Sequence, residues 1–160
     1  MERAELLGSI EPPTPEDREA ITAVARDYVE GWFDGDELRM RRSLHPELVK
    51  RTIYRDPATG DWRLGRPADA EMMVGWTRAG QGRTAVAEER AFEIVIESVF
   101  RHLASVRVLS SPYMDYLHVA KLGNRWLIAN VLWEVREGET APSPAGIAHA
   151  RVRHVPGASL

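Results

Sequence analysis

The sequence contains no cysteine, which excludes disulfide bonds, cysteine-ligated zinc and thiol nucleophiles. It also lacks a strong charge of either sign: its formal net charge is -3, which argues against nucleic acid or an anionic membrane as the main partner. No apolar run is long enough to span a bilayer, and residues 1–5 lack the basic start of a signal peptide. We therefore expect a soluble cytoplasmic protein of one domain, since 160 residues suffice for a substantial core.

Several signatures of chemistry are missing as well. The sequence has no glycine loop that would cradle phosphate and no serine-nucleophile elbow. No histidine and carboxylate have the spacing of metal ligands, so we expect neither a metal site nor a cofactor. The basic residues Arg39, Arg41, Arg42, Lys50, Arg51 and Arg55 are interspersed with acids, which favours a solvated charged face.

Clear helix signals open the chain after a proline-rich lead-in. Thr14 is placed to cap a helix with Pro15 at its first position, and an apolar stripe at helical spacing continues to Gly35. The next elements are predicted as a helix over 36–44, a strand over 48–55 that turns back into 62–64, a helix over 68–79 and strands over 91–100 and 104–109. The prediction is one α+β domain over 16–137, with a lead-in over 1–15 and a C-terminal arm over 138–160.

A hairpin is predicted where residues 113–122 meet 125–135 across Gly123-Asn124, because glycine accepts the positive φ of a tight turn. Pairing Lys121 with Trp126 places His118 opposite Ala129 and sorts the side chains onto two faces. One predicted face carries Tyr116, His118, Ala120, Leu127, Ala129, Val131 and Trp133. The other carries Asp115, Leu117, Val119, Trp126, Ile128, Asn130 and Leu132. The first face mixes polar aromatic and small residues, which is typical of a cavity lining.

The order of helices and strands resembles the nuclear transport factor 2-like superfamily. Within it, three segments resemble the SnoaL-like group and the branch described as "putative lumazine-binding": 28–32 (YVEGW), 44–49 (LHPELV) and 115–119 (DYLHV). The resemblance implies a cone in which three N-terminal helices pack on a curved mixed or antiparallel sheet. It implies no particular reaction, because this fold hosts many chemistries.

Ketosteroid isomerases belong to the same superfamily, and the resemblance assigns roles to four positions. Tyr28 falls where the oxyanion-hole tyrosine sits, His118 where the second oxyanion donor sits, and Trp133 on a tryptophan of the steroid pocket. The general-base aspartate is replaced by Thr52, whose hydroxyl is too weak a base to remove a carbon-bound proton. Steroid-type isomerisation through that carboxylate is therefore not expected, but two hydrogen-bonding groups remain in one cavity.

The catalytic candidates are Tyr28 as a donor to a developing oxyanion and His118 as the group that moves a proton. The ligand-binding candidates, drawn from the helices and the predicted cavity face, are Trp32, Thr52, Tyr54, Met73, Trp76, Tyr116, Ala129 and Trp133. The alternative for both catalytic candidates is an ordinary core role. Asp115 lies three residues from His118 and thus on the opposite face, so it is expected to anchor a hairpin end or an interface.

The second hairpin face is apolar, and an exposed apolar face usually marks a protein contact. We therefore predict a homodimer formed sheet against sheet, in which the C-terminal arm could contact the other subunit. Three functions stay open at this point. The cavity could perform lyase, isomerase or cyclase chemistry on a carbonyl compound, bind a heterocycle without turnover, or be filled by its own side chains in a structural domain.

Overall fold

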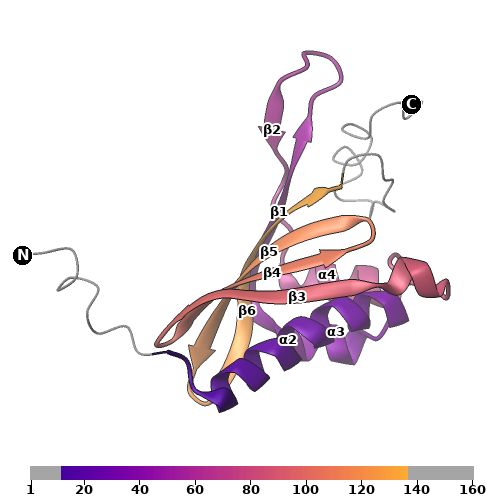
Figure 1. The fold of residues 1–160 in the computed structure, drawn as a ribbon. Coiled ribbons are helices and arrows are strands. Elements are labelled where there is room, and N and C mark those ends of the chain that lie inside the picture. The colour runs from indigo at the N-terminus through magenta and orange to yellow at the C-terminus, as the bar shows by residue number, and fades with distance from the viewer. Residues whose placement is uncertain (1–11, 137–160) are drawn as a thin grey trace, which may run out of the picture.

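A computed structural model describes residues 12–136 and shows helices lying against one face of a curved, open sheet (Figure 1). The elements in chain order are α2 (Pro15–Asp34), α3 (Glu37–Ser43), β1 (Leu44–Arg55), β2 (Trp62–Leu64), α4 (Ala70–Arg78), the 3₁₀ turn η1 (Ala87–Arg90), β3 (Phe92–Phe100), β4 (Leu103–Ser110), β5 (Tyr113–Leu122) and β6 (Arg125–Val135). The six strands are ordered β2-β1-β6-β5-β4-β3. Only the β1–β6 pair is parallel, so the sheet is mixed, as predicted.

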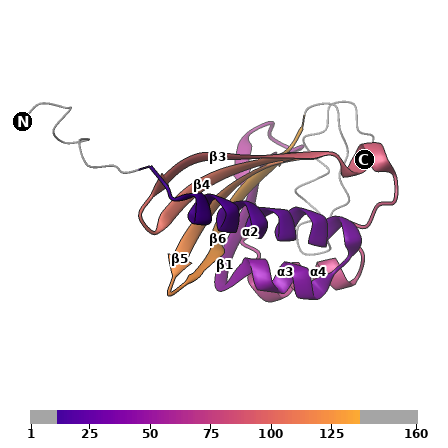
Figure 2. The same cartoon turned by 60° about the horizontal axis from the view of Figure 1, so that its bottom comes forward.

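The helices form where the sequence signals predict them. The Thr14 hydroxyl accepts a hydrogen bond from the Asp17 amide at 3.1 Å, and Gly35 ends α2 at a φ of 68°. Asp36 and Asp69 cap α3 and α4 in the same way. The buried stripe of α2 packs on the inner face of the sheet (Figure 2).

Strand β1 begins at Leu44, earlier than predicted, and continues past Pro46 through an irregular register to Arg55. Its far end and β2 extend as a hairpin beyond the body of the sheet (Figure 1). The segment before α4 runs along β1: Lys50 and Ala68 exchange two backbone hydrogen bonds of 2.9 and 2.8 Å. These bonds hold the backbone of Lys50 on the side of β1 that faces away from β6.

The predicted hairpin forms, but its register changes part-way. Lys121 pairs with Trp126 as expected, whereas His118 pairs with Asn130 because Ala129 is an extra residue in a β-bulge. The prediction that pairs His118 with Ala129 is therefore wrong. The inner face, under the helices, carries Asp115, Leu117 and Val119 from β5 and Trp126, Ile128, Val131 and Trp133 from β6.

The burial of the inner face removes most of the predicted basis for a dimer, and of the apolar residues predicted to form it only Leu132 is exposed. Leu117, Val119, Trp126 and Ile128 do not form an exposed surface, because they are core residues covered by helices. The lead-in residues 1–11 and the C-terminal arm 138–160 lie outside the described residues. Within residues 12–136, no helix has the length and apolar character needed to cross a membrane.

Candidate functional site

A hollow opens between α2, α4 and the inner face of the sheet. It is lined by Tyr28, Val29, Trp32, Lys50, Met73, Trp76, Ser110, Tyr113, Asp115 and Trp133. The free space inside the cavity is only about 30 Å³, whereas about 450 Å³ is reached by counting the crevices between wall atoms and the open solvent at the mouth. The inner space is thus narrow, with room for water and for the polar end of a ligand.

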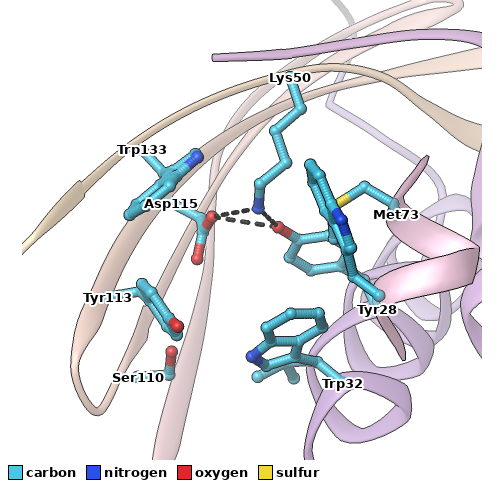
Figure 3. A pocket seen from close by; sticks show the side chains of 10 residues that line it. Tyr28, Trp32, Lys50, Met73, Ser110, Tyr113, Asp115 and Trp133 are labelled. Carbon is cyan, nitrogen blue, oxygen red and sulfur yellow. Dashed lines mark hydrogen bonds and ion pairs between the residues drawn. The ribbon is translucent and has the colours of Figure 1, made fainter. Parts of the chain in front are cut away.

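Three polar side chains meet at the inner end of this cavity (Figure 3). The Tyr28 hydroxyl donates to Oδ1 of Asp115 at 3.1 Å and accepts a hydrogen bond from Nζ of Lys50. Nζ also lies 3.5 Å from Oδ1 of Asp115, which closes a triangle of contacts. The side chains of Lys50 and Asp115 are only 11% and 6% exposed, so this is a buried charged cluster.

Each member comes from a different element, and the sheet register sets their spacing. Tyr28 lies on the buried stripe of α2. On the sheet, Lys50 pairs with Val131 of β6, and Asp115 pairs with Trp133 of the same strand from the other side. Lys50 and Asp115 therefore flank β6 on its inner face, where both reach Tyr28.

Burial decides the electrostatics of the cluster. It raises the pKa of the Asp115 carboxyl, and Lys50 partly opposes this. It lowers the pKa of the Lys50 ammonium, which Asp115 in turn opposes. Burial and the nearby Asp115 charge hold the pKa of Tyr28 well above its usual value, so its hydroxyl stays protonated and can donate. Burial thus favours the neutral form of each group, whereas the attraction between Lys50 and Asp115 favours the charged pair.

Aromatic rings form the remaining walls. Nζ of Lys50 lies 5.0 Å from the ring centre of Tyr28 and 5.4 Å from that of Trp133, within cation–π range. Tyr113 meets Trp133 edge to face, with ring centres 5.4 Å apart. Trp32 is held against Gly82, where an added Cβ would lie 2.1 Å from the indole. The cavity thus combines flat apolar walls with one polar end.

The family model described as "Putative lumazine-binding" matches residues 16–134. The chain belongs to this family. Solved structures with the same fold include an NTF-2-like protein of unknown function from Silicibacter pomeroyi, which is 18% identical with a TM-score of 0.59 over 78% of this chain and 99% of that one. An NTF2-like protein of unknown function from Methylobacillus flagellatus is 17% identical, with a TM-score of 0.58 over 80% and 98%.

A domain of unknown function with a cystatin-like fold from Nostoc punctiforme is 18% identical, with a TM-score of 0.51 over 76% and 78% of the two chains. At these identities the structures establish the fold alone. They confirm the predicted α+β cone, and the family match together with this fold confirms the predicted superfamily. No curated protein matches the sequence at a significant level.

In this family member, five of the ten predicted site residues line the cavity: Tyr28, Trp32, Met73, Trp76 and Trp133. Their action on a ligand stays a prediction. Thr52 is buried beside the cavity without lining it, and its hydroxyl donates to the backbone carbonyl of Trp133 at 3.0 Å. Tyr54 is half-buried further along β1, where it pairs with Arg63 of β2.

Three predicted site residues lie away from the cavity. His118 is exposed on the outer face of the sheet, where its Nδ1 lies 3.3 Å from Nδ2 of Asn130. Tyr116 is 49% exposed on the same face, and Ala129 is the bulge residue. The prediction that these side chains face the cavity is wrong, because β5 presents Asp115 and its i+2 neighbours inward instead.

Sequence reasoning missed Lys50 and Asp115. Lys50 was grouped with five arginines, of which Arg39 and Arg42 do form partly exposed ion pairs with Asp27. A usable signal was its place between Leu48 and Thr52 at strand spacing, which puts a cation on a buried face. For Asp115 the signal was its alternation with Leu117 and Val119. Within residues 12–136 there is no cluster of three or more potential metal ligands.

Proposed function

We propose that this protein binds a small ring-bearing organic molecule in the cavity between α2, α4 and the sheet. The observation that supports this most is the buried Lys50–Tyr28–Asp115 cluster, which lies at the end of an aromatic cavity. Removing such charges from water costs several kcal/mol per ion, so a buried ion pair is a poor device for stability alone. A few polar groups at the end of an apolar cavity are typical of ligand sites.

The geometry suggests how a ligand would be held. The ammonium of Lys50 has three donors, and within residues 12–136 the structure pairs it with two acceptors. The third donor suits a carbonyl oxygen of the ligand, while the rings of Trp32 and Trp76 suit its flat faces. A heterocycle with carbonyl edges, as the description of the family suggests, combines both features.

The narrow inner space adds a requirement. Ligand cavities typically have volumes of about 300–1,000 Å³, far more than the free space of about 30 Å³ here, so a ring can enter only if lining side chains move. Trp32 and Trp76 are half-buried, and Met73 has the most adaptable of apolar side chains. Binding should therefore change the environment of these two tryptophans.

Calorimetric titration with lumazine and with simple aromatic carbonyl compounds tests the proposal. We expect Tyr28→Phe to weaken binding by about five- to tenfold, because the hydroxyl accepts a hydrogen bond from the Lys50 ammonium and orients it toward the ligand, and one hydrogen bond contributes about 1 kcal/mol. Tyr116→Phe is the matched control, since this tyrosine lies on the outer face, and it should bind like the wild type. If no such compound binds with Kd below about 1 mM, the cavity is better explained as filled by its own side chains.

A second candidate is proton transfer next to a carbonyl, as in lyase, isomerase or cyclase reactions. It is supported by the carboxyl group of Asp115 in the cavity. The resemblance to ketosteroid isomerases predicts no carboxyl base there, because Thr52 replaces their aspartate. Lys50 and Tyr28 would hold the carbonyl oxygen, while Asp115 removes and returns a proton on the adjacent carbon. NMR would detect exchange of the α-protons of cyclohexanone in D₂O, and Asp115→Asn should abolish it. Exchange at the uncatalysed rate would leave binding as the function.

We also propose that two copies associate through the outer sheet face, with Leu132 as predicted and with Tyr116 in place of the predicted residues that lie in the core. Tyr116 and Leu132 pair across β5 and β6 and are 49% and 42% exposed. Sedimentation velocity at micromolar concentration should show a dimer for the wild type and a monomer for Leu132→Glu, because a buried charge would oppose the contact. A wild-type monomer would contradict this arrangement. The cytoplasmic location stays a prediction.

A further inference from the structure

We propose that Lys50 is a nucleophilic amine that forms a reversible imine with an aldehyde or ketone group of the ligand. This inference rests on the proposed function, because it names the bond that would hold a carbonyl-bearing ligand in the cavity. It goes beyond binding, because it assigns covalent chemistry to one side chain. The argument draws on the composition of the chain, the contacts of Nζ and the proton donors around it.

The composition singles out Lys50. The chain has 21 lysine and arginine residues, and only two of them, Lys50 and Lys121, are lysines. Arginine is the usual choice for a buried ion pair, because its planar guanidinium binds a carboxylate through two hydrogen bonds and stays charged. Lysine differs in that it can lose its proton when buried and then act as a nucleophile. An arginine-rich chain that carries lysine at its buried pair points to a role for the neutral amine.

The contacts of the two lysines differ accordingly. Nζ of Lys121 forms a 2.9 Å ion pair with Asp17 near the surface, and its side chain is 31% exposed. Nζ of Lys50 instead points into the cavity, between the rings of Tyr28 and Trp133, at a looser 3.5 Å from Asp115 (Figure 3). A ligand that reaches the inner end of the cavity meets this nitrogen.

Asp115 and Tyr28 can accept and donate the protons that imine formation requires. Burial lowers the pKa of Lys50 and raises that of Asp115, so transfer of a proton from Nζ to the carboxylate leaves two neutral groups and no change in net charge. That transfer frees the lone pair on nitrogen for attack. The Tyr28 hydroxyl, which contacts both groups, stays a proton donor.

The reaction balances with these groups alone. The Nζ lone pair forms a bond to the carbonyl carbon, and the carbonyl oxygen takes a proton from Asp115 or Tyr28, which gives a carbinolamine. The nitrogen then returns a proton to Asp115, and the hydroxyl takes that proton and leaves as water, which gives a protonated imine beside the Asp115 carboxylate. An amine and a carbonyl thus become an imine and water, with no oxidant or reductant. The inner cavity has room for the released water, which needs about 10–15 Å³.

Reductive trapping tests the proposal on the wild-type chain, so it does not depend on a variant that folds. The protein is treated with propanal or benzaldehyde and cyanoborohydride at pH 7.4, and peptide mass mapping locates the secondary amine. Lys121 and the amino terminus serve as internal controls. An ordinary lysine is only about 0.1% neutral at this pH, so a Lys50 that is mostly protonated but about 1% neutral should be labelled about tenfold faster than Lys121. Labelling at Lys121 and the amino terminus with Lys50 unmodified by both aldehydes would overturn the proposal.

Benzyl alcohol, which cannot form an imine, separates this inference from the proposed function. If it binds and also slows the labelling of Lys50, both proposals are supported. If it binds while Lys50 stays unmodified, ligand binding stands and the imine is refuted. If Lys50 is labelled rapidly without protection by benzyl alcohol or any ring compound, the amine is reactive but the proposed ring-binding function fails.

Discussion

The charge on Asp115 should be what keeps Lys50 protonated inside the protein. Asp115→Asn removes this charge and keeps the shape and an acceptor oxygen for Tyr28. Lys50 then has no counterion within the cluster, and burial already lowers its pKa. We therefore expect the variant to fold with a neutral lysine, which must release a proton that the unfolded chain retains.

The loss of unfolding free energy in Asp115→Asn can be estimated from the cost of removing this proton from Lys50. Between the ordinary lysine pKa of about 10.4 and pH 7 lie about 3.4 pH units, each worth about 1.4 kcal/mol, which gives an upper bound near 5 kcal/mol. Breaking a buried ion pair by removing one partner typically costs about 3–5 kcal/mol, in agreement with this bound. Because the folded pKa of Lys50 lies below the unfolded one, the lost stability returns as the pH rises. At pH 9 the deficit should shrink to about 2 kcal/mol or less.

Urea unfolding followed by circular dichroism at pH 7, 8 and 9 measures this difference from the wild type. Adding Lys50→Met to Asp115→Asn removes the titrating amine, so the pH dependence should vanish. Asp17→Asn breaks the other lysine–aspartate pair and is the matched control. Hydrogen bonding from Lys121 lowers the pKa of Asp17, so its contribution is lost at acid pH and not in this range. An Asp115→Asn variant as stable as the wild type at all three pH values would refute the buried pair.

Three further variants test the surroundings of the cluster. His118→Ala should change the unfolding free energy by less than about 0.5 kcal/mol in the same assay, because the side chain is exposed, and a larger loss would place it in the core. Gly82→Ala should destabilise by about 1–3 kcal/mol and shift the tryptophan emission, because the new Cβ displaces Trp32, and an unchanged spectrum would contradict that contact. Thr52→Val should cost about 1 kcal/mol through the lost bond to the Trp133 carbonyl, while ligand affinity, measured by calorimetry, stays the same.

The helices and most strands could be predicted because their signals are local. A cap, a first-turn proline and a terminal glycine fix α2 within the sequence that forms it. The start of β1 could not be predicted in this way, because a proline such as Pro46 usually ends regular structure. Here the strand continues past Pro46, which lies at an exposed position where the register is irregular. The parallel pairing of β1 with β6 joins residues about 80 positions apart, which no local pattern encodes.

The cluster itself escaped prediction for a different reason. Lys50, Tyr28 and Asp115 are brought together by tertiary contacts between α2, β1 and β5, and none of them is unusual within its own segment. A lysine among arginines is typical of a solvated surface. What separates Lys50 from the arginines is the face of β1 on which it lies, and the buried residues Leu48 and Thr52, two positions before and after it, define that face.

The β-bulge at Ala129 decides which face of the sheet Trp133 lies on. Because side chains alternate along a strand with a period of two, a regular register places Trp133 on the face of His118, and one extra residue moves it to the face of Asp115. The inward residues show this change of phase in the sequence. On β6 they step by two from Trp126 to Ile128, by three to Val131 and by two again to Trp133. A single inserted residue therefore places Trp133 in the cavity wall beside the carboxyl group of Asp115 and the amine of Lys50, and away from the imidazole of His118.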